Sequence, residues 1–203
     1  MQPAITSLFE FELATAGAST QTFCKIMEDI PTSKLLQDFG GILVELRRRG
    51  ICRSENIPTG DLAEHLACKA LELTIAAKSA KGFDALDSAG ARYQIKGRRI
   101  TPWNPSTQLS AVRDLPSGPF DFLIAVLFDQ EFRLTAAYRF TFAACHQAAR
   151  FVDRTNSYTL FANNSLIMHP DTLDLTTVIR SAYENPEAEQ AETQQPLSAA
   201  LFT

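Results

Sequence analysis

The spacing of apolar residues predicts two helices in the first half of the chain. Between Pro31 and Gly50, apolar side chains recur every three to four residues, and the pattern ends in the arginines 47–49. This spacing places the apolar side chains on one face of a helix, and a basic last turn before a glycine suits its carboxyl end. A second helix is predicted from Pro58, with one face formed by Leu62, Leu66, Ala70 and Leu73.

After the second helix the pattern changes to short runs that are alternating or wholly apolar, with glycine and proline between them. These runs predict strands at residues 74–77, 83–87, 92–99, 120–128 and 133–140. The continuous apolar run Phe122–Phe128 is typical of a central strand buried on both faces. Further helices are predicted at 21–28, 141–151 and 171–183, with a strand at 158–161. The order predicts a mixed α/β domain.

The chain divides by composition into three predicted parts. Residues 1–57 form an N-terminal helical region, residues 58–183 carry the α/β core, and residues 184–203 form an acidic tail that we expect to be disordered. No apolar run approaches the ~20 residues that span a bilayer, so no membrane partner is expected. The four cysteines are scattered without zinc spacing, and the N-terminus lacks a signal pattern, which together indicate a cytoplasmic protein.

The net charge of −4 hides a local basic region. From Glu184 onward the tail has four acidic residues and no basic residue. The remaining chain therefore contains 19 of the 23 acidic residues and all 19 basic residues, and its net charge is zero. One stretch gathers many of these bases: Lys78, Lys81, Arg92, Lys96, Arg98, Arg99 and Arg113. A local basic surface matters more for phosphate binding than the total charge does. The overall acidity therefore does not exclude a nucleic-acid partner.

The candidate chemistry lies around the strand predicted at 92–99. Alternation places Gln94 and Lys96 on one face of this strand. Asp84 stands ten positions before Gln94, and Gly90 supplies a turn, so a hairpin brings the carboxylate beside both. Glu64, on the preceding helix, is close enough in the chain to pack against the same hairpin. Taken alone, the polar strand face is also explained by simple contact with solvent.

These residue types suit metal-assisted cleavage of a phosphodiester. Mg²⁺ prefers oxygen ligands and usually takes one or two carboxylates, so we expect Asp84, Gln94 and Glu64 to hold Mg²⁺, for which Mn²⁺ can substitute. Lys96 would orient or deprotonate the attacking water and stabilise charge on the phosphate. The residues expected to contact nucleic acid are Arg98, Arg99, Gln108 and Arg113.

Three segments carry a resemblance to a known family. Gly60-Asp61-Leu62-Ala63-Glu64, Gly82-Phe83-Asp84-Ala85 and Tyr93-Gln94-Ile95-Lys96-Gly97-Arg98 resemble the core of the PD-(D/E)xK, or restriction-endonuclease-like, nuclease superfamily. The resemblance covers about a third of the chain. It implies a helix before a mixed four-stranded sheet, followed by a helix and another strand. It also implies catalytic roles for Glu64, Asp84, Gln94 and Lys96.

The sequence departs from that pattern in two places. No proline precedes Asp84, and Gln94 replaces the usual acidic residue, which removes one negative charge from the metal site. The leading hypothesis is a Mg²⁺-dependent DNA endonuclease, for example in restriction or phage defence. Its alternatives are an inactive nucleic-acid-binding module of the same fold and a protein-interaction domain.

Two features of the flanks leave alternatives open. The apolar stripe of the helix at 33–49 could form a homodimer interface. Trp103, between two prolines after the strand at 92–99, either packs to hold its loop or stacks on a nucleobase.

Overall fold

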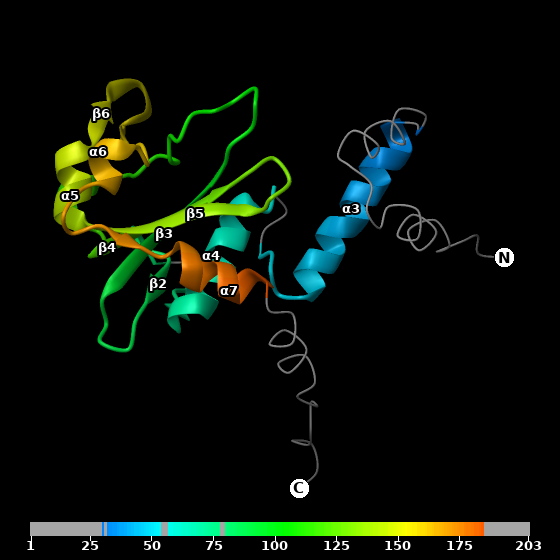
Figure 1. The fold of residues 1–203 in the computed structure, drawn as a ribbon, viewed down its shortest axis with the longest axis horizontal. Helices are drawn as coiled ribbons and strands as arrows, with labels where there is room; N and C mark the ends of the chain where they lie inside the picture. Colours follow the sequence, from blue (N-terminus) through cyan, green and yellow to red (C-terminus); the bar gives the residue numbers. More distant parts are fainter. Residues whose placement is uncertain (1–29, 31, 54–56, 78–79, 185–203) are drawn as a thin grey trace, which may run out of the picture. The chain divides into compact units, whose positions relative to one another are not determined.

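A computed structural model describes residues 30, 32–53, 57–77 and 80–184 (Figure 1). The chain divides into two compact units, residues 1–45 and 46–203, and the helix α3 (Thr32–Arg48) crosses this boundary. The helix predicted at 21–28 and the tail from residue 185 lie outside the described residues. The described helices include none with the length and apolar character needed to cross a membrane.

The helix α3 matches the first predicted helix, and its apolar stripe is open to solvent. The exposed members of this stripe are Leu36, Phe39, Ile42 and Val44. Of the arginines that follow, Arg47 and Arg48 close the last turn of the helix.

The second unit is a mixed α/β domain. Its helices are α4 (Thr59–Leu71), α5 (Phe142–Ala148), α6 (Asn164–Ile167) and α7 (Thr176–Glu184), with short 3₁₀ turns at Leu115–Ser117 and Asp153–Thr155. The strands are β1 (Thr74–Ile75), β2 (Ala85–Leu86), β3 (Arg92–Arg99), β4 (Phe122–Phe128), β5 (Leu134–Thr141), β6 (Arg150–Val152), β7 (Ser157–Thr159) and β8 (Leu173–Asp174). Both the fold class and the order of the main elements agree with the sequence prediction.

Six strands form one mixed sheet in the order β1-β2-β3-β4-β5-β8. Among the described strands, β3 and β4 alone run parallel, and Ile95 pairs with Ile124 at the middle of their ladder. The run Phe122–Phe128 is buried from Leu123 onward, as expected for a strand covered on both faces. A separate ribbon is formed by β6 and β7.

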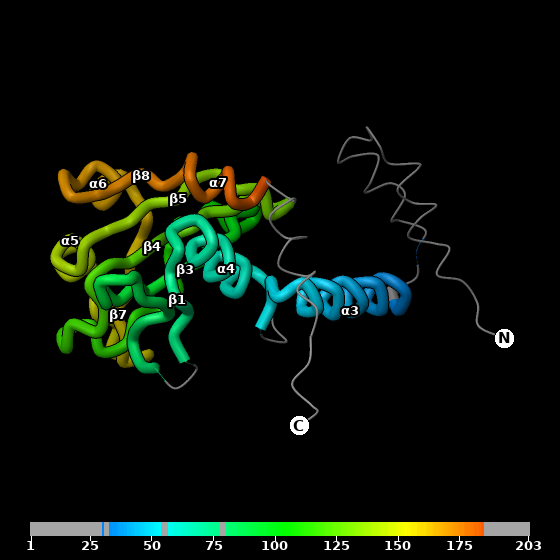
Figure 2. The backbone as a smooth tube through the Cα atoms, turned by 90° about the horizontal axis from the view of Figure 1, so that it is seen from below, coloured from blue at the N-terminus to red at the C-terminus, as the bar shows by residue number. Residues whose placement is uncertain are grey.

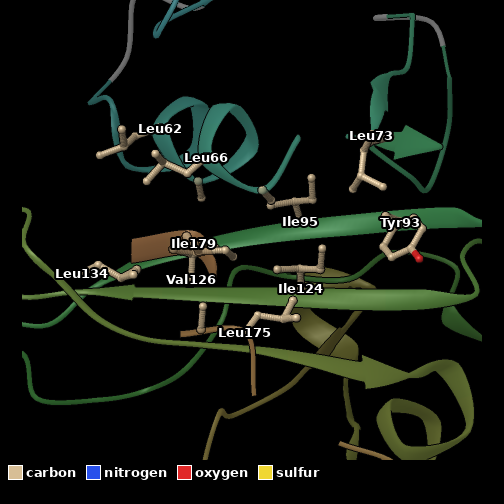
Figure 3. Packing of buried hydrophobic residues seen from close by; sticks show 14 of the residues in the cluster. Leu62, Leu66, Leu73, Tyr93, Ile95, Ile124, Val126, Leu134, Leu175 and Ile179 are labelled. Carbon is tan, nitrogen blue, oxygen red and sulfur yellow. The ribbon is translucent and has the colours of Figure 1, made fainter. Parts of the chain in front are cut away.

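Each face of the sheet has its own core. On one face α4 and α7 lie side by side, α4 over β3 and α7 over β5 (Figures 1 and 2). Figure 3 shows Leu62 and Leu66 of α4 above Ile95, with Ile179 of α7 near Val126. On the other face, Leu123, Ala125 and Leu127 of β4 pack with α5, α6 and residues from the β3–β4 connection. The even-numbered positions of β3, including Gln94 and Lys96, are in register with these three residues and share that face.

The connection from β3 to β4, residues 100–121, is here called the arch. It contains the 3₁₀ turn Leu115–Ser117 and no α-helix. Its middle is fixed to the β6–β7 ribbon by hydrogen bonds from Leu109 N to Leu160 O, 2.9 Å, and between Val112 and Tyr158 in both directions, 2.9 and 2.8 Å. The arch residues Leu109, Val112 and Leu115 are buried and pack with β4. The arch therefore covers the polar face of β3 as a fixed wall.

Two predicted helices are shorter than expected. The one at 141–151 ends at Ala148, because Phe151 leaves the helix to pair with Tyr158 in the β6–β7 ribbon. The one at 171–183 begins only at Thr176, since Leu173 first pairs with Arg139 at the sheet edge. In both places strand pairing with a distant segment overrides the local helical pattern.

Gly97 allows α4 to approach β3 closely. A Cβ atom at this position would lie 2.3 Å from the carbonyl oxygen of Thr59 and 3.0 Å from Cβ of Ala63. Ala63 and Ala67 on the same helix are fully buried. Small residues on both elements thus set the height of α4 over the sheet, and with it the position of Glu64.

Asp121 holds the start of the parallel pair. Its carboxylate accepts from the backbone nitrogen of Arg92 at 2.8 Å and from the guanidinium at 2.9 and 3.2 Å. Its own backbone nitrogen donates to Arg92 O at 2.9 Å. These contacts with Arg92 lower the pKa of Asp121. One residue therefore fixes where β4 enters beside β3.

We predict that Gly97→Ala destabilises the protein by about 2 kcal/mol, because the added methyl group forces α4 away from β3. Urea unfolding followed by circular dichroism measures this. The matched control is Gly60→Ala on α4 itself, where the new Cβ meets open space. An equal decrease in stability in both variants would contradict the close approach.

We predict that Asp121→Asn lowers stability at neutral pH by about 1 kcal/mol, since a half-exposed charged pair is partly screened. A carboxyl whose pKa is lowered in the fold stabilises above its ordinary pKa of about 4, and this stabilisation is lost as the pH falls through the lowered value. The unfolding free energies of wild type and variant should therefore converge in acid. Asp153→Asn, a surface carboxyl in the turn after β6, serves as control. A difference that is independent of pH would contradict the role of the ionised carboxylate.

Candidate active site

The backbone around Asp84 is held on both sides. Asp84 N donates to Tyr93 O at 2.7 Å, and Asp84 O accepts from Ala76 N at 2.8 Å. The turn predicted at Gly90 is present, with a positive φ of 83° and a hydrogen bond from Gly90 N to Asp87 O. This confirms the predicted hairpin between β2 and β3 and places Asp84 beside Gln94.

The carboxylate of Asp84 completes the edge of β3. The β2–β3 ladder ends at the pair Ala85–Tyr93, and beyond it Ile95 N donates to Oδ2 of Asp84 at 2.7 Å. The same oxygen accepts from Nε2 of Gln94 at 2.6 Å. A side chain thus takes the role of a missing strand carbonyl. The result is a carboxylate fixed in position at an open sheet edge.

Gln94 is one of the few buried polar side chains in the described residues, with 7% of its surface exposed. Its amide nitrogen is directed at Asp84, which leaves the amide oxygen Oε1 directed elsewhere. A buried amide of this kind is stable only when hydrogen-bonded. Gln94 and Asp84 therefore form one unit, as the sequence predicted.

Glu64 lies near this unit from the side of α4. Burial raises the pKa of Glu64, and the Asp84 carboxylate raises it further, whereas an ion pair with Arg53 lowers it. The Asp84 carboxylate is thus one of the charges that act on the Glu64 carboxyl. In this structure the Arg53 guanidinium donates a hydrogen bond to the Glu64 carboxylate.

Lys96 is the cation of the group. Burial lowers its pKa, and the charges of Asp84 and Glu64 act in the opposite direction. Of the four predicted catalytic residues, Asp84 and Gln94 are in contact, and Gln94 and Lys96 line one cleft. Glu64 is linked to them by the action of its charge on Lys96.

The donor set fits a divalent cation in part. Two neighbouring carboxylates, one of them with a raised pKa, favour a cation between them, and the Gln94 amide oxygen is a further hard ligand. No three His, Cys, Asp or Glu side chains group closely enough to hold a metal within the described ranges. A metal here would rest on Asp84, Glu64 and the Gln94 amide, with Arg53 displaced from Glu64.

A cleft of about 680 Å³ opens on the same strand and is here called the strand cleft. Its cations are Lys81, Arg92, Lys96 and Arg113, and Gln94 and Asp114 also line it. Because β3 forms one wall and the arch the other, a ligand in the cleft would contact Gln94 and Lys96 directly. Four cations against one carboxylate suit an anionic ligand.

Two predicted nucleic-acid contacts have partners within the protein. Arg98 donates to Ser106 O at 2.9 Å and to Oδ1 of Asn104 at 2.8 Å, which fixes the first turn of the arch. Arg99 donates to Gln130 O at 3.0 Å and stacks on Phe132, with 4.6 Å from Cζ to the ring centroid. Both side chains hold loops, so any contact with nucleic acid would have to form beside these bonds.

The arch carries the other predicted contacts. Arg113 lines the strand cleft and Gln108 lies farther along the arch in an adjoining pocket. Trp103 stands on the turn that Arg98 fixes and is 87% exposed. Its exposure argues against the role of packing to hold the loop.

Sequence reasoning missed two members of the site. Lys81 lines the cleft from the segment before Asp84, and Arg53 pairs with Glu64. Lys81 belongs to the basic stretch that the sequence shows, but nothing singled it out. Arg53 carries no sequence signal, because its pairing depends on how the segment before α4 folds back.

One turn after Glu64, burial raises the pKa of Cys68 to about 11, which argues against a reactive thiol.

No protein-family profile matches this sequence, and a search of curated proteins gives no match.

We predict that Gln94→Glu lowers the melting temperature in metal-free buffer, by the equivalent of about 2 kcal/mol, because a second carboxylate replaces the amide that donates to Asp84. In roughly 10 mM Mg²⁺ the variant should gain more stability than wild type, since a ligand that binds the folded state stabilises it. Differential scanning calorimetry measures both changes.

The control for this prediction is Gln147→Glu, an exposed glutamine on α5. It makes the same chemical change away from the site and should leave both melting temperatures near those of wild type. A Mg²⁺ response no larger in Gln94→Glu than in wild type would count against a metal at this position.

Proposed function

We propose that this protein is a Mg²⁺-dependent endonuclease that hydrolyses DNA phosphodiester bonds, with a Q-x-K form of the PD-(D/E)xK site. The observation that carries the proposal is the contact between Asp84 and Gln94 beside the partly buried Lys96, at the wall of a cationic cleft. The element order supports it: a helix, a hairpin and a parallel strand beside β3. After the sheet, α5 and the strand β6 follow in the order that the family resemblance implies.

Each residue has a chemical role in this proposal. Mg²⁺, or Mn²⁺ in its place, would supply Lewis-acid activation of water and charge stabilisation at the phosphate. Asp84, Glu64 and the Gln94 amide oxygen would hold it. Lys96, lining the cleft, orients the attacking water and stabilises negative charge on the phosphate. Arg113 and Lys81 hold neighbouring phosphate oxygens.

A second candidate is a nucleic-acid-binding module without catalysis. It is favoured by the neutral Gln94, whose amide already satisfies Asp84, and by the ion pair between Arg53 and Glu64. Such a module would use the same strand cleft to bind phosphate. It differs from the nuclease in showing no metal-dependent cleavage.

The biological setting and the assembly are also proposals. A role in restriction or phage defence fits a DNA endonuclease. The exposed apolar stripe on α3 supports a homodimer, an arrangement that would allow both strands of a duplex to be cut.

We predict that the full-length protein nicks supercoiled plasmid in Mg²⁺ or Mn²⁺ and not in EDTA. Asp84→Asn and Lys96→Met should each reduce the rate by about 100-fold or more, because Asp84 would hold the metal ion and Lys96 stabilises negative charge on the reacting phosphate. Gel electrophoresis of plasmid over time measures the rate.

The controls for this prediction are Asp153→Asn and Lys69→Met, which change the same residue types outside the strand cleft. They should cleave as wild type does. Cleavage that persists in both Asp84→Asn and Lys96→Met would exclude this site as its source. DNA binding without any cleavage would favour the second candidate.

A further inference from the structure

A second pocket continues the strand cleft along the arch. This ribbon pocket, of about 410 Å³, lies between the arch and the β6–β7 ribbon. Gln108 and Ala111 of the arch line one side, and Arg150 and Arg154 of the ribbon line the other. Ala111 also lines the strand cleft, so the two hollows share part of one wall. The wall is fixed by the backbone bonds between arch and ribbon.

The cations without partners concentrate in these two hollows. Within the described residues, the side chains of Lys81, Arg113, Arg150 and Arg154 take part in no hydrogen bond or ion pair. By contrast, Arg92 in the strand cleft is paired with Asp121, and Arg98, Arg99 and Arg133 outside both hollows are bonded to carboxylates or carbonyls. Lys69 on α4 is another cation with no such partner, and it lies outside both hollows. Four free cations in two connected hollows favour an extended anion over a single ion.

The chemistry of the ribbon pocket matches a sugar–phosphate backbone. Its lining combines the two arginines with the Gln108 amide, the hydroxyl of Thr159 and the partly exposed ring of Phe161. No carboxylate lines it, although Asp153 is next to Arg154 in the chain and Asp114 lies in the strand cleft. Arginine, amide and hydroxyl groups are the usual donors to DNA phosphates, whereas an aromatic ring packs against sugar or base.

We propose that the ribbon pocket and the strand cleft form one track for a DNA backbone, in which Arg150 and Arg154 hold phosphates beyond the one at Gln94 and Lys96. This inference rests on the proposed nuclease for its choice of DNA. It assigns substrate binding to the β6–β7 ribbon, which lies outside the region of family resemblance. The contacts are to phosphate, so they act on every DNA sequence alike.

The test is DNA binding in EDTA, where cleavage plays no part. The full-length protein is titrated against a fluorescein-labelled duplex of about 20 base pairs, and anisotropy is measured at several salt concentrations. Arg150→Gln with Arg154→Gln should weaken binding roughly tenfold at low salt. The slope of log K against log salt should become shallower by about 0.9 for each phosphate that the variant no longer neutralises.

The matched control removes two cations away from the track, Lys69→Gln with Arg133→Gln. It should leave affinity and slope near those of wild type. Equal weakening in control and test variants would overturn the proposal, since it would reflect total charge alone. An unchanged slope in the ribbon variant would also overturn it, even if the wild type cleaves plasmid.

Two further outcomes identify the bound partner and distinguish the DNA track from the nuclease proposal. If polyglutamate of equal charge displaces the duplex as well as unlabelled DNA does, the surface serves acidic polypeptides and the DNA track is wrong. If the ribbon variant binds weakly as expected but the wild type shows no cleavage in Mg²⁺, the track stands and the nuclease proposal fails.

Discussion

The edge of β3 beyond Tyr93 is the constraint on which the site depends. The strand β2 pairs with only two residues of β3, so the amide of Ile95 has no strand carbonyl opposite it. An unpaired buried amide is unfavourable, and here the Asp84 carboxylate accepts its hydrogen. The hydrogen bond that completes the sheet edge therefore also fixes the carboxylate that the proposed chemistry requires.

The open edge also lets residues from both faces of the sheet meet. Gln94 and Lys96 belong to the face beneath the arch, whereas Glu64 comes from α4 on the opposite face. In the interior of a sheet these side chains would be separated by the strands themselves. At the edge they share one electrostatic environment, because the Asp84 charge helps to raise the pKa of Glu64 and opposes the lowering of the Lys96 pKa by burial. The close packing at Gly97 sets how far α4 reaches toward that edge.

The arch connects this edge to the rest of the domain. A parallel pair of strands needs a crossover, which in most α/β domains is a helix. Here the crossover is an irregular segment held by buried leucines and by bonding to the β6–β7 ribbon. A wall of this kind presents side chains such as Arg113 and Trp103 outward, where a packed helix would direct much of its surface inward. The cationic hollows on this face follow from that arrangement.

The sequence by itself determined the strands β3 and β4, the helices α3 and α4, and the hairpin that joins Asp84 to Gln94. Their signals are local: alternation, apolar periodicity and a glycine turn within a few residues. The tertiary structure decided the rest, since the pairing of Phe151 with Tyr158 ended a predicted helix. It also decided that Arg98 and Arg99 donate to loop carbonyls and that Arg53 pairs with Glu64. Such partners are distant in the chain, so the periodicity of the sequence does not reveal them. Local pattern thus specifies elements and near neighbours, and packing specifies which charges remain free to act.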